Sequence, residues 1–174
     1  YLNQVFRGIK EHGLLDQCDA VLTGYLGSTD IGHATLNIWD EVRWANPSAL
    51  IICDPILGDE AEGIYVSRSL VSFYRERAIP KADLMFPNRF ELELLSGMKV
   101  ADPPGAVKAS RLLINRGPKT VVATSIPAGE NLSTILVTRN TAQQILTPHV
   151  KVSVKGSGDL LAALYLGGIM ARDV

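Results

Sequence analysis

The chain has 174 residues, of which 47% are hydrophobic and 20% charged, so it is too apolar for intrinsic disorder and long enough for one domain. Its 17 basic and 18 acidic residues give a net charge of −1, which argues against non-specific nucleic-acid binding. No apolar run approaches the roughly 20 residues of a membrane-spanning helix, and two isolated cysteines, Cys18 and Cys53, indicate a reducing, cytoplasmic setting rather than a disulfide framework.

Helix-like and strand-like patterns alternate along the first half of the chain. Apolar residues at helical spacing, from Leu2 to Ile9, predict a first helix that ends near Gly13. After it we expect a strand over 20–23, a helix over 31–45, a strand over 49–53 and a helix over 67–78.

The second half continues the alternation. We expect a strand over 83–86, a helix over 89–96 ended by Gly97, a helix capped by Asp102 and running to about 115, a strand over 120–124, a hairpin over 133–138 and 143–147, and a helix over 158–170. The last helix is apolar almost all round, which predicts that it is buried.

Continuous apolar strands that alternate with helices predict an α/β fold with a mostly parallel sheet covered on both faces, and the hairpin adds an antiparallel part near the C-terminus. With no repeat or linker in view, residues 1–174 are expected to form a single domain. The chain starts at Tyr1 inside a helical pattern and stops soon after an apolar helix. We therefore expect the domain to be incomplete at both ends.

Small, acidic and hydroxyl residues follow four of the predicted strands. Such residues collect in turns for conformational reasons alone, and that explains any one of the four segments. In open parallel sheets, however, ligands bind beyond the carboxyl ends of the strands, so four such turns on one edge indicate a site. The segments are Gly24–Ser28, Asp54–Asp59, Pro87–Glu91 and Thr124–Ser125.

The sequence Lys155-Gly156-Ser157-Gly158-Asp159 stands directly before the last predicted helix. Its glycines allow a tight turn, and the N–H groups and dipole at the helix start favour an anion such as phosphate. The segment is neither a Walker A loop nor G-x-G-x-x-G, and an ordinary helix start explains it equally well. Lys155 is either a phosphate contact or a solvated lysine.

Asn88 and Glu91 have the spacing of a capping box, which accounts for both residues without a metal. Their place at the expected ligand edge favours a second role. Because Mg²⁺ needs only one or two carboxylates besides phosphate and water, Asp54 and Glu91 suffice for a magnesium site. Tyr65 is either part of that site or an ordinary half-buried aromatic residue.

Taken in order, these motifs resemble those of the pyridoxal kinases of the ribokinase superfamily, over essentially the whole chain. The G-x-G-D motif at 156–159 is shared across ribokinase-like enzymes, whereas D-P-x-x-G-D-x-x-x-G-x-Y-V at 54–66 is specific to vitamin B6 kinases rather than sugar kinases. The resemblance implies a ribokinase-like three-layer α/β/α sandwich.

The resemblance also implies an activity: ATP-dependent phosphorylation of the 5′-hydroxymethyl group of pyridoxal, pyridoxine or pyridoxamine. ATP and Mg²⁺ are the implied cofactors, with K⁺ as a further cation, and the implied assembly is a homodimer. A hydroxymethylpyrimidine kinase or another ribokinase-like kinase, such as a sugar kinase, is the alternative within the same fold. A non-catalytic protein that binds vitamin B6 is the alternative of another class.

Site residues are implied in the same way. Asp159 is the expected base that accepts the hydroxyl proton, and the anion hole is expected at Gly156, Ser157 and Gly158. The metal region comprises Asp54, Asn88, Glu91 and Tyr65. Nucleotide contacts are expected from Asp54, Phe86, Thr124 and Ser125, and from the hairpin end at Ile145, Leu146, Thr147 and Pro148, around the adenine. The residues that hold the pyridine ring are expected upstream of Tyr1.

Overall fold

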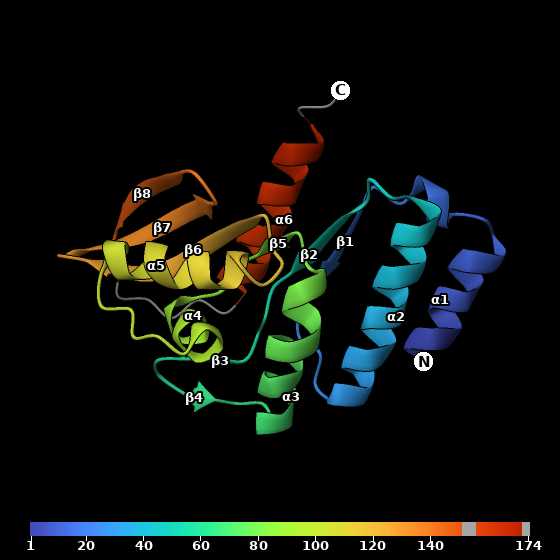
Figure 1. Ribbon diagram of the computed structural model, residues 1–174, viewed down its shortest axis with the longest axis horizontal. Coiled ribbons are helices and arrows are strands. Elements are labelled where there is room, and N and C mark those ends of the chain that lie inside the picture. Colours follow the sequence, from blue (N-terminus) through green and yellow to red (C-terminus); the bar gives the residue numbers. More distant parts are fainter. Residues whose placement is uncertain (151–155, 172–174) are drawn as a thin grey trace.

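The structure, a computed structural model, describes residues 1–150 and 156–171, and its centre is a six-stranded sheet (Figure 1). The first four strands in spatial order run parallel and the last two run antiparallel to their neighbours. The spatial order is β1 (Ala20–Thr23), β2 (Leu50–Cys53), β5 (Leu84–Met85), β6 (Thr120–Ala128), β7 (Asn131–Thr138) and β8 (Ala142–Pro148).

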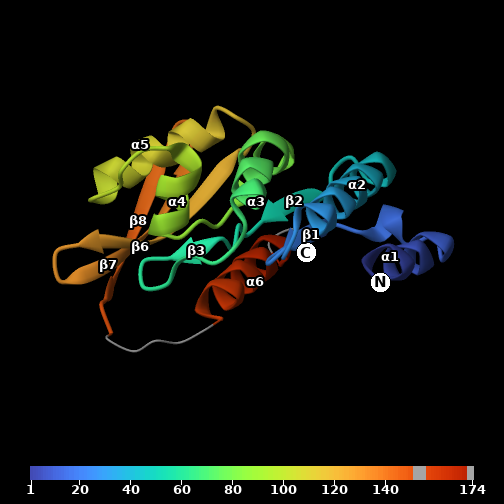
Figure 2. The ribbon, with the colours of Figure 1, turned by 90° about the horizontal axis from the view of Figure 1, so that it is seen from below.

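Helices cover both faces of this sheet, as the sequence predicts. Figure 2 shows α6 (Ser157–Met170) on one side of the sheet and the helices α3 to α5 on the other. Helix α1 (Leu2–Glu11) packs against α2 rather than against the strands. The other helices are α2 (Thr29–Ala45), α3 (Arg68–Phe73), α4 (Arg89–Ser96) and α5 (Pro103–Ile114).

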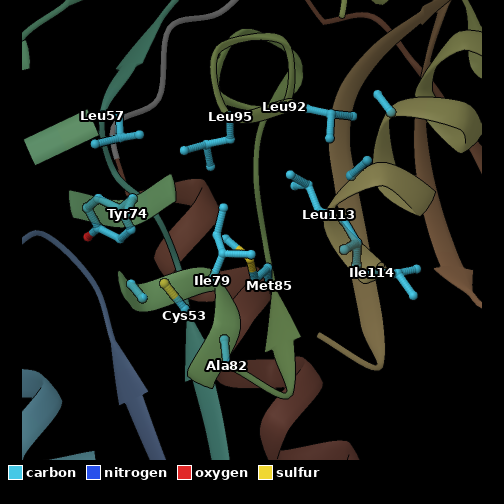
Figure 3. Close-up of a cluster of buried hydrophobic side chains, with 14 of the residues drawn as sticks. Cys53, Leu57, Tyr74, Ile79, Ala82, Met85, Leu92, Leu95, Leu113 and Ile114 are labelled. Atoms are coloured by element: carbon cyan, nitrogen blue, oxygen red, sulfur yellow. The ribbon is translucent and has the colours of Figure 1, made fainter. Parts of the chain in front are cut away.

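Alternate residues of the parallel strands feed two separate cores, because successive strand side chains point to opposite faces. Ile51 and Cys53 join the larger core, on the side of α2 to α5, whereas Ile52 joins the smaller core beneath α6. Figure 3 shows part of the larger core, in which strand residues such as Met85 lie near helix residues such as Leu113. The central parallel strands β2 and β5 are therefore buried on both faces, whereas Leu22 in the edge strand β1 is 38% exposed.

The predicted elements are present with small shifts at their ends, and three features were not predicted. A short hairpin joins β3 (Gly58–Asp59) to β4 (Gly63–Ile64), and its two-residue strands are too short to leave a period-two pattern. The helix predicted over 67–78 begins as α3 and continues as a π turn over Tyr74–Ala78. Short 3₁₀ turns occupy Leu15–Gln17 and Ile79–Lys81.

Strand β6 also continues beyond the predicted range 120–124. Its register against β7 shifts between Ala123 and Ile126, and Ser125 sits in the bulge with a φ of 58°, a left-handed conformation that is unusual outside glycine. The bulge marks where β6 stops following its parallel neighbour. Among the described residues, the remainder of the strand pairs with β7 alone, which is why Pro127 is tolerated there.

The prediction of a fully buried last helix is wrong. Helix α6 packs one face on the smaller core, through Ala162 and Tyr165, while Leu160 and Leu164 on the opposite face are 61% and 65% exposed. A uniformly apolar helix carries no periodic signal that would reveal which face is covered. None of the described helices is long and apolar enough to cross a membrane.

Two helix glycines provide a test of how tightly α2 packs. A Cβ atom at Gly32 would lie 2.6 Å from the ring of the buried Phe73, whereas one at Gly8 in α1 would meet nothing within 4 Å. We expect Gly32→Ala to lower the free energy of unfolding by roughly 1–3 kcal/mol through overpacking. The control Gly8→Ala should raise it by up to about 1 kcal/mol, because alanine favours helix. Denaturant unfolding measures both, and equal effects would contradict this packing.

Candidate active site

A cleft of about 210 Å³ opens at the carboxyl edge of the parallel strands. It gathers side chains and backbone from the loop after β2, the β3–β4 hairpin, the loop after β5, the first turn of α4, strand β6 and the start of α6. The lining residues are Asp54, Ile56, Asp59, Tyr65, Phe86, Asn88, Glu91, Thr124, Gly156, Gly158 and Asp159. The sequence therefore predicted both the edge and most of its residues.

Asp159 lies in the first turn of α6, against the loop that follows β1. A Cβ atom at Gly24 would lie 3.7 Å from its Oδ1, and one at Gly156 would lie 3.9 Å from its Oδ2. Gly156 has a φ of 84° and is the N-cap residue of α6, so this turn needs glycine. The first backbone bond of the helix runs from the Leu160 N–H to the Gly156 carbonyl, so the amides of Gly158 and Asp159 precede it.

Asp54 is an acid buried at the end of β2. It is 6% exposed, and its backbone N–H donates to the Thr23 carbonyl at 2.8 Å. Among the described residues, none donates a hydrogen bond to its carboxylate. Burial, and secondarily the charge of Asp159, raise the pKa of Asp54 to about 7. This side chain therefore favours a proton or a cation as its partner.

Glu91 is 3% exposed, and it links α4 to two other segments. Its Oε1 accepts from the Leu57 N–H at 2.9 Å and its Oε2 from the Asn88 N–H at 3.0 Å, while Asn88 Oδ1 accepts from the Glu91 N–H at 2.9 Å. Burial raises the pKa of Glu91 to about 8, against the lowering effect of these hydrogen bonds. The capping box is thus confirmed, and its glutamate also lines the cleft.

Asp54 and Glu91 fit a magnesium ion that shares its ligands with phosphate and water. Both are hard oxygen donors, they lie in one cleft, and the charge of Asp54 raises the pKa of Glu91. Within residues 1–150 and 156–171, no group of three or more acidic, histidine or cysteine side chains forms a metal site on its own. Two carboxylates leave several coordination positions of Mg²⁺ open, and oxygen atoms of a nucleotide phosphate are suitable ligands for them.

Thr124 and Ser125 face different cavities. Thr124 lines the cleft, and its N–H donates to the Pro87 carbonyl at 3.0 Å, which fixes β6 beside the loop that carries Asn88. Ser125 is exposed and lines an adjoining cavity of about 450 Å³ together with His149. Asp59 and Asn88 line both cavities, so the two are adjacent.

Several predicted residues do not line the cleft. Ile145, Leu146, Thr147 and Pro148 lie in the edge strand β8, where every residue is exposed. Ser157 begins α6 but is not among the lining residues, and Lys155 lies outside the described residues. Conversely, Ile56 and Asp59 line the cleft without a predicted role. Asp59 stands inside the specific D-P-x-x-G-D motif, and that position was the available signal.

Comparison with known proteins gives a consistent result. Residues 6–171 match the model of a family described as phosphomethylpyrimidine kinase. The chain is 42% identical to a pyridoxal kinase, PdxY, of Rubrobacter xylanophilus, over 97% of this chain and 60% of the relative. The chain thus spans about three-fifths of the length of this curated relative.

Two solved structures share the fold. Pyridoxal kinase from Leishmania donovani in complex with ADP and pyridoxamine superposes with a TM-score of 0.84 at 29% identity, covering 92% of this chain and 57% of that one. A phosphomethylpyrimidine kinase homologue from Bacteroides thetaiotaomicron, in a crystal form with pyridoxal, gives a TM-score of 0.86 at 28% identity over 97% and 60%. These structures confirm the predicted ribokinase-like fold class.

The raised pKa values of the two buried acids predict how stability depends on pH. The folded chain holds these protons to about pH 7 and pH 8, whereas the unfolded chain releases them near pH 4. The free energy of unfolding should therefore fall as pH rises from about 4 to 8, by up to about 1.4 kcal/mol per pH unit for each proton. Urea unfolding without divalent metal measures this slope.

Asp54→Asn should flatten that slope and should be more stable than the parent at pH 8, because the amide has no proton to lose. The control Asp16→Asn removes an exposed acid from the 3₁₀ turn at Leu15–Gln17 and should keep the parent slope. Equal slopes in the parent and Asp54→Asn would show that Asp54 does not hold a proton in the folded state.

Proposed function

Because the chain belongs to the phosphomethylpyrimidine kinase family, we propose that it forms most of the phosphoryl-transfer site of an ATP-dependent kinase for the 5′-hydroxymethyl group of pyridoxal and related B6 vitamers. One observation carries this proposal. The cleft collects the glycine turn, the acid Asp159 and the buried acids Asp54 and Glu91 from segments far apart in sequence. Similarity to pyridoxal kinases supports the choice of acceptor.

In this proposal Asp159 is the base. Its carboxylate lies at the start of α6, where the positive end of the helix favours a negative charge, and beside the loop after β1. An acceptor hydroxyl placed between Asp159 and the γ-phosphate of ATP gives up its proton to this carboxylate as the new O–P bond forms, while the bond from the γ-phosphorus to the bridging oxygen breaks and ADP leaves with the electron pair. Phosphoryl transfer demands mainly positioning and charge stabilisation, so a carboxylate that is a weak base is adequate.

The glycine turn is proposed as the anion hole. Its amides precede the first hydrogen bond of α6 and stand on a helix that packs one face on the smaller core. Donors fixed in this way stabilise charge on a transferring phosphoryl group without reorganising. Mg²⁺, when bound, neutralises phosphate oxygens, and Asp54 and Glu91 are the residues proposed to hold it, with Asn88 and Tyr65 beside them. A K⁺ site and contacts from Phe86, Thr124 and Ser125 to the nucleotide stay predictions.

We further propose that these residues belong to one ribokinase-like domain whose remaining parts complete the nucleotide and pyridine sites. A homodimer and a cytoplasmic location stay predictions of the sequence. The second candidate function is phosphorylation of a hydroxymethylpyrimidine, which the description of the matching family favours and which uses a similar acceptor group. A vitamin-B6-binding protein without turnover is the remaining alternative, and the presence of Asp159 together with Gly156 and Gly158 argues against it.

Asp159→Asn tests the base. In the full-length protein, kcat with pyridoxal should fall by roughly 10²–10⁴-fold, the usual contribution of general-base catalysis. ATP affinity, titrated separately, should change little because asparagine is isosteric with aspartate. Full turnover in the variant would eliminate Asp159 as the base. A loss of ATP affinity in proportion to kcat would instead make Asp159 an organiser of the glycine turn.

Gly158 and Ser157 separate backbone from side-chain contributions to the anion hole. A Cβ atom at Gly158 meets no protein atom within 4 Å, so Gly158→Val should fold and place its side chain in the open cleft. The valine side chain would keep a phosphate away from the N–H groups of the turn. Because loss of an anion-hole contact typically costs ~10²–10³ in turnover, we expect a loss of that size. Ser157→Ala keeps the backbone N–H and should be mild. Near-normal turnover in a folded Gly158→Val protein would refute this role.

A further inference from the structure

The first turn of α4 contacts the β3–β4 hairpin at three successive places. Glu91 accepts the Leu57 N–H at 2.9 Å, Asn88 donates from Nδ2 to the Gly58 carbonyl at 2.9 Å, and the Arg89 guanidinium pairs with the Glu60 carboxylate. The contacts therefore follow the chain from the residue before β3 to the turn of the hairpin. The first turn of α4 therefore contacts the first strand of this hairpin and the turn that follows it.

The hairpin itself is compact and carries two residues of the cleft, Asp59 and Tyr65. Asp59 Oδ1 accepts the backbone N–H groups of Ala61 and Glu62 at 2.9 and 2.7 Å, which shapes the turn. At its base, the Tyr65 N–H donates to the Leu57 carbonyl at 3.2 Å. A displacement of the turn therefore moves Asp59 directly.

The hairpin also packs closely on α4 at its base. A Cβ atom at Gly58 would lie 2.3 Å from the Gly63 carbonyl oxygen and 2.7 Å from the Phe90 ring, so the two limbs and the helix meet there without room for a side chain. The turn residues beyond this point are different, since Glu60, Ala61 and Glu62 are exposed. Packing therefore contributes little to the position of the turn, and a contact from outside the hairpin can restrict it.

Arg89 is placed to hold that turn. Its side chain is 20% exposed, and its Nη1 donates to the Val100 carbonyl at 3.4 Å, while Val100 is fixed by the bond from its own N–H to Glu93 Oε1 at 2.8 Å. The guanidinium thus bridges a fixed loop and the Glu60 carboxylate, which is 61% exposed. An arginine with one end anchored loses less freedom in forming the second contact.

We propose that Arg89 is a positioning residue, which through its ion pair with Glu60 holds the β3–β4 hairpin so that Asp59 and Tyr65 stay at the cleft. The expected effect on KM rests on the proposed kinase function, whereas the role of Arg89 in holding the hairpin does not. Asn88 and Glu91 fix the base of the hairpin, and Arg89 fixes its turn. Arg89 does not line the 210 Å³ cleft, but together with Glu60 it lines the adjoining cavity of about 450 Å³, so we expect its effect on ligand affinity rather than on the chemical step.

Charge reversal tests the proposal in the full-length protein. Glu60→Arg and Arg89→Glu each replace attraction by repulsion, and each should raise KM for Mg-ATP about two- to tenfold, the scale of a partly exposed ion pair, with kcat within about twofold. The double variant E60R/R89E restores the pair with its signs exchanged and should return KM toward the parent value. A double variant as impaired as the worse single variant would overturn the proposal, as would single variants with unchanged KM.

A second readout needs no activity. Amide hydrogen exchange over residues 58–64 in the ligand-free protein should be faster in each single variant and return toward the parent rate in the double variant. The control Glu41→Lys breaks the exposed Lys10–Glu41 pair between α1 and α2 and should change neither KM nor this exchange. If the protein lacks kinase activity, the proposed function fails, and the exchange rates alone decide the role of Arg89: unchanged exchange in both single variants refutes it.

Discussion

Asp54 and Glu91 are two carboxylates buried at one end of the sheet. Each needs a proton or a cation as a partner, and the rest of the site is arranged around that need. Neither forms an ion pair with a basic side chain in the described part of the chain. Burial without a positive partner raises the pKa of both, so each competes for a proton unless a cation arrives. Burying a carboxylate without a cation is unfavourable, which is hard to explain for an acid with a purely structural role. It suits a cleft that receives a metal together with a nucleotide.

The fold brings this arrangement about by simple means. Parallel strands end at one edge, so the residues that follow β2 and β5 meet Thr124 of β6 there, although Asp54 and Thr124 are far apart in the sequence. Helix α6, packed on the opposite face from α2 to α5, then delivers its N-terminus to the same edge. Negative groups of the sheet and the positive end of a helix thus face one small volume. Such a volume suits a polyphosphate with its cation.

Much of this was readable from the sequence because the signals are local. The capping box of Asn88 and Glu91, the left-handed Gly97 and the apolar strand before Asp54 each follow from neighbouring residues. What could not be read depends on distant contacts. The β3–β4 hairpin is held by α4, the bulge at Ser125 by pairing with β7, and the exposed face of α6 by the side on which the smaller core forms. The exposure of Ile145 on β8 also depends on contacts between distant segments, so the sequence did not reveal it.

The function proposed for this cleft is transfer of a phosphoryl group from ATP to a vitamin B6 hydroxymethyl group. Steady-state rates of the full-length protein with Mg-ATP, measured for pyridoxal and for hydroxymethylpyrimidine under identical conditions, test it most directly. We expect a metal-dependent transfer with a higher kcat/KM for pyridoxal. A higher kcat/KM for the pyrimidine would contradict the assigned acceptor, and no transfer to either acceptor would contradict the kinase itself.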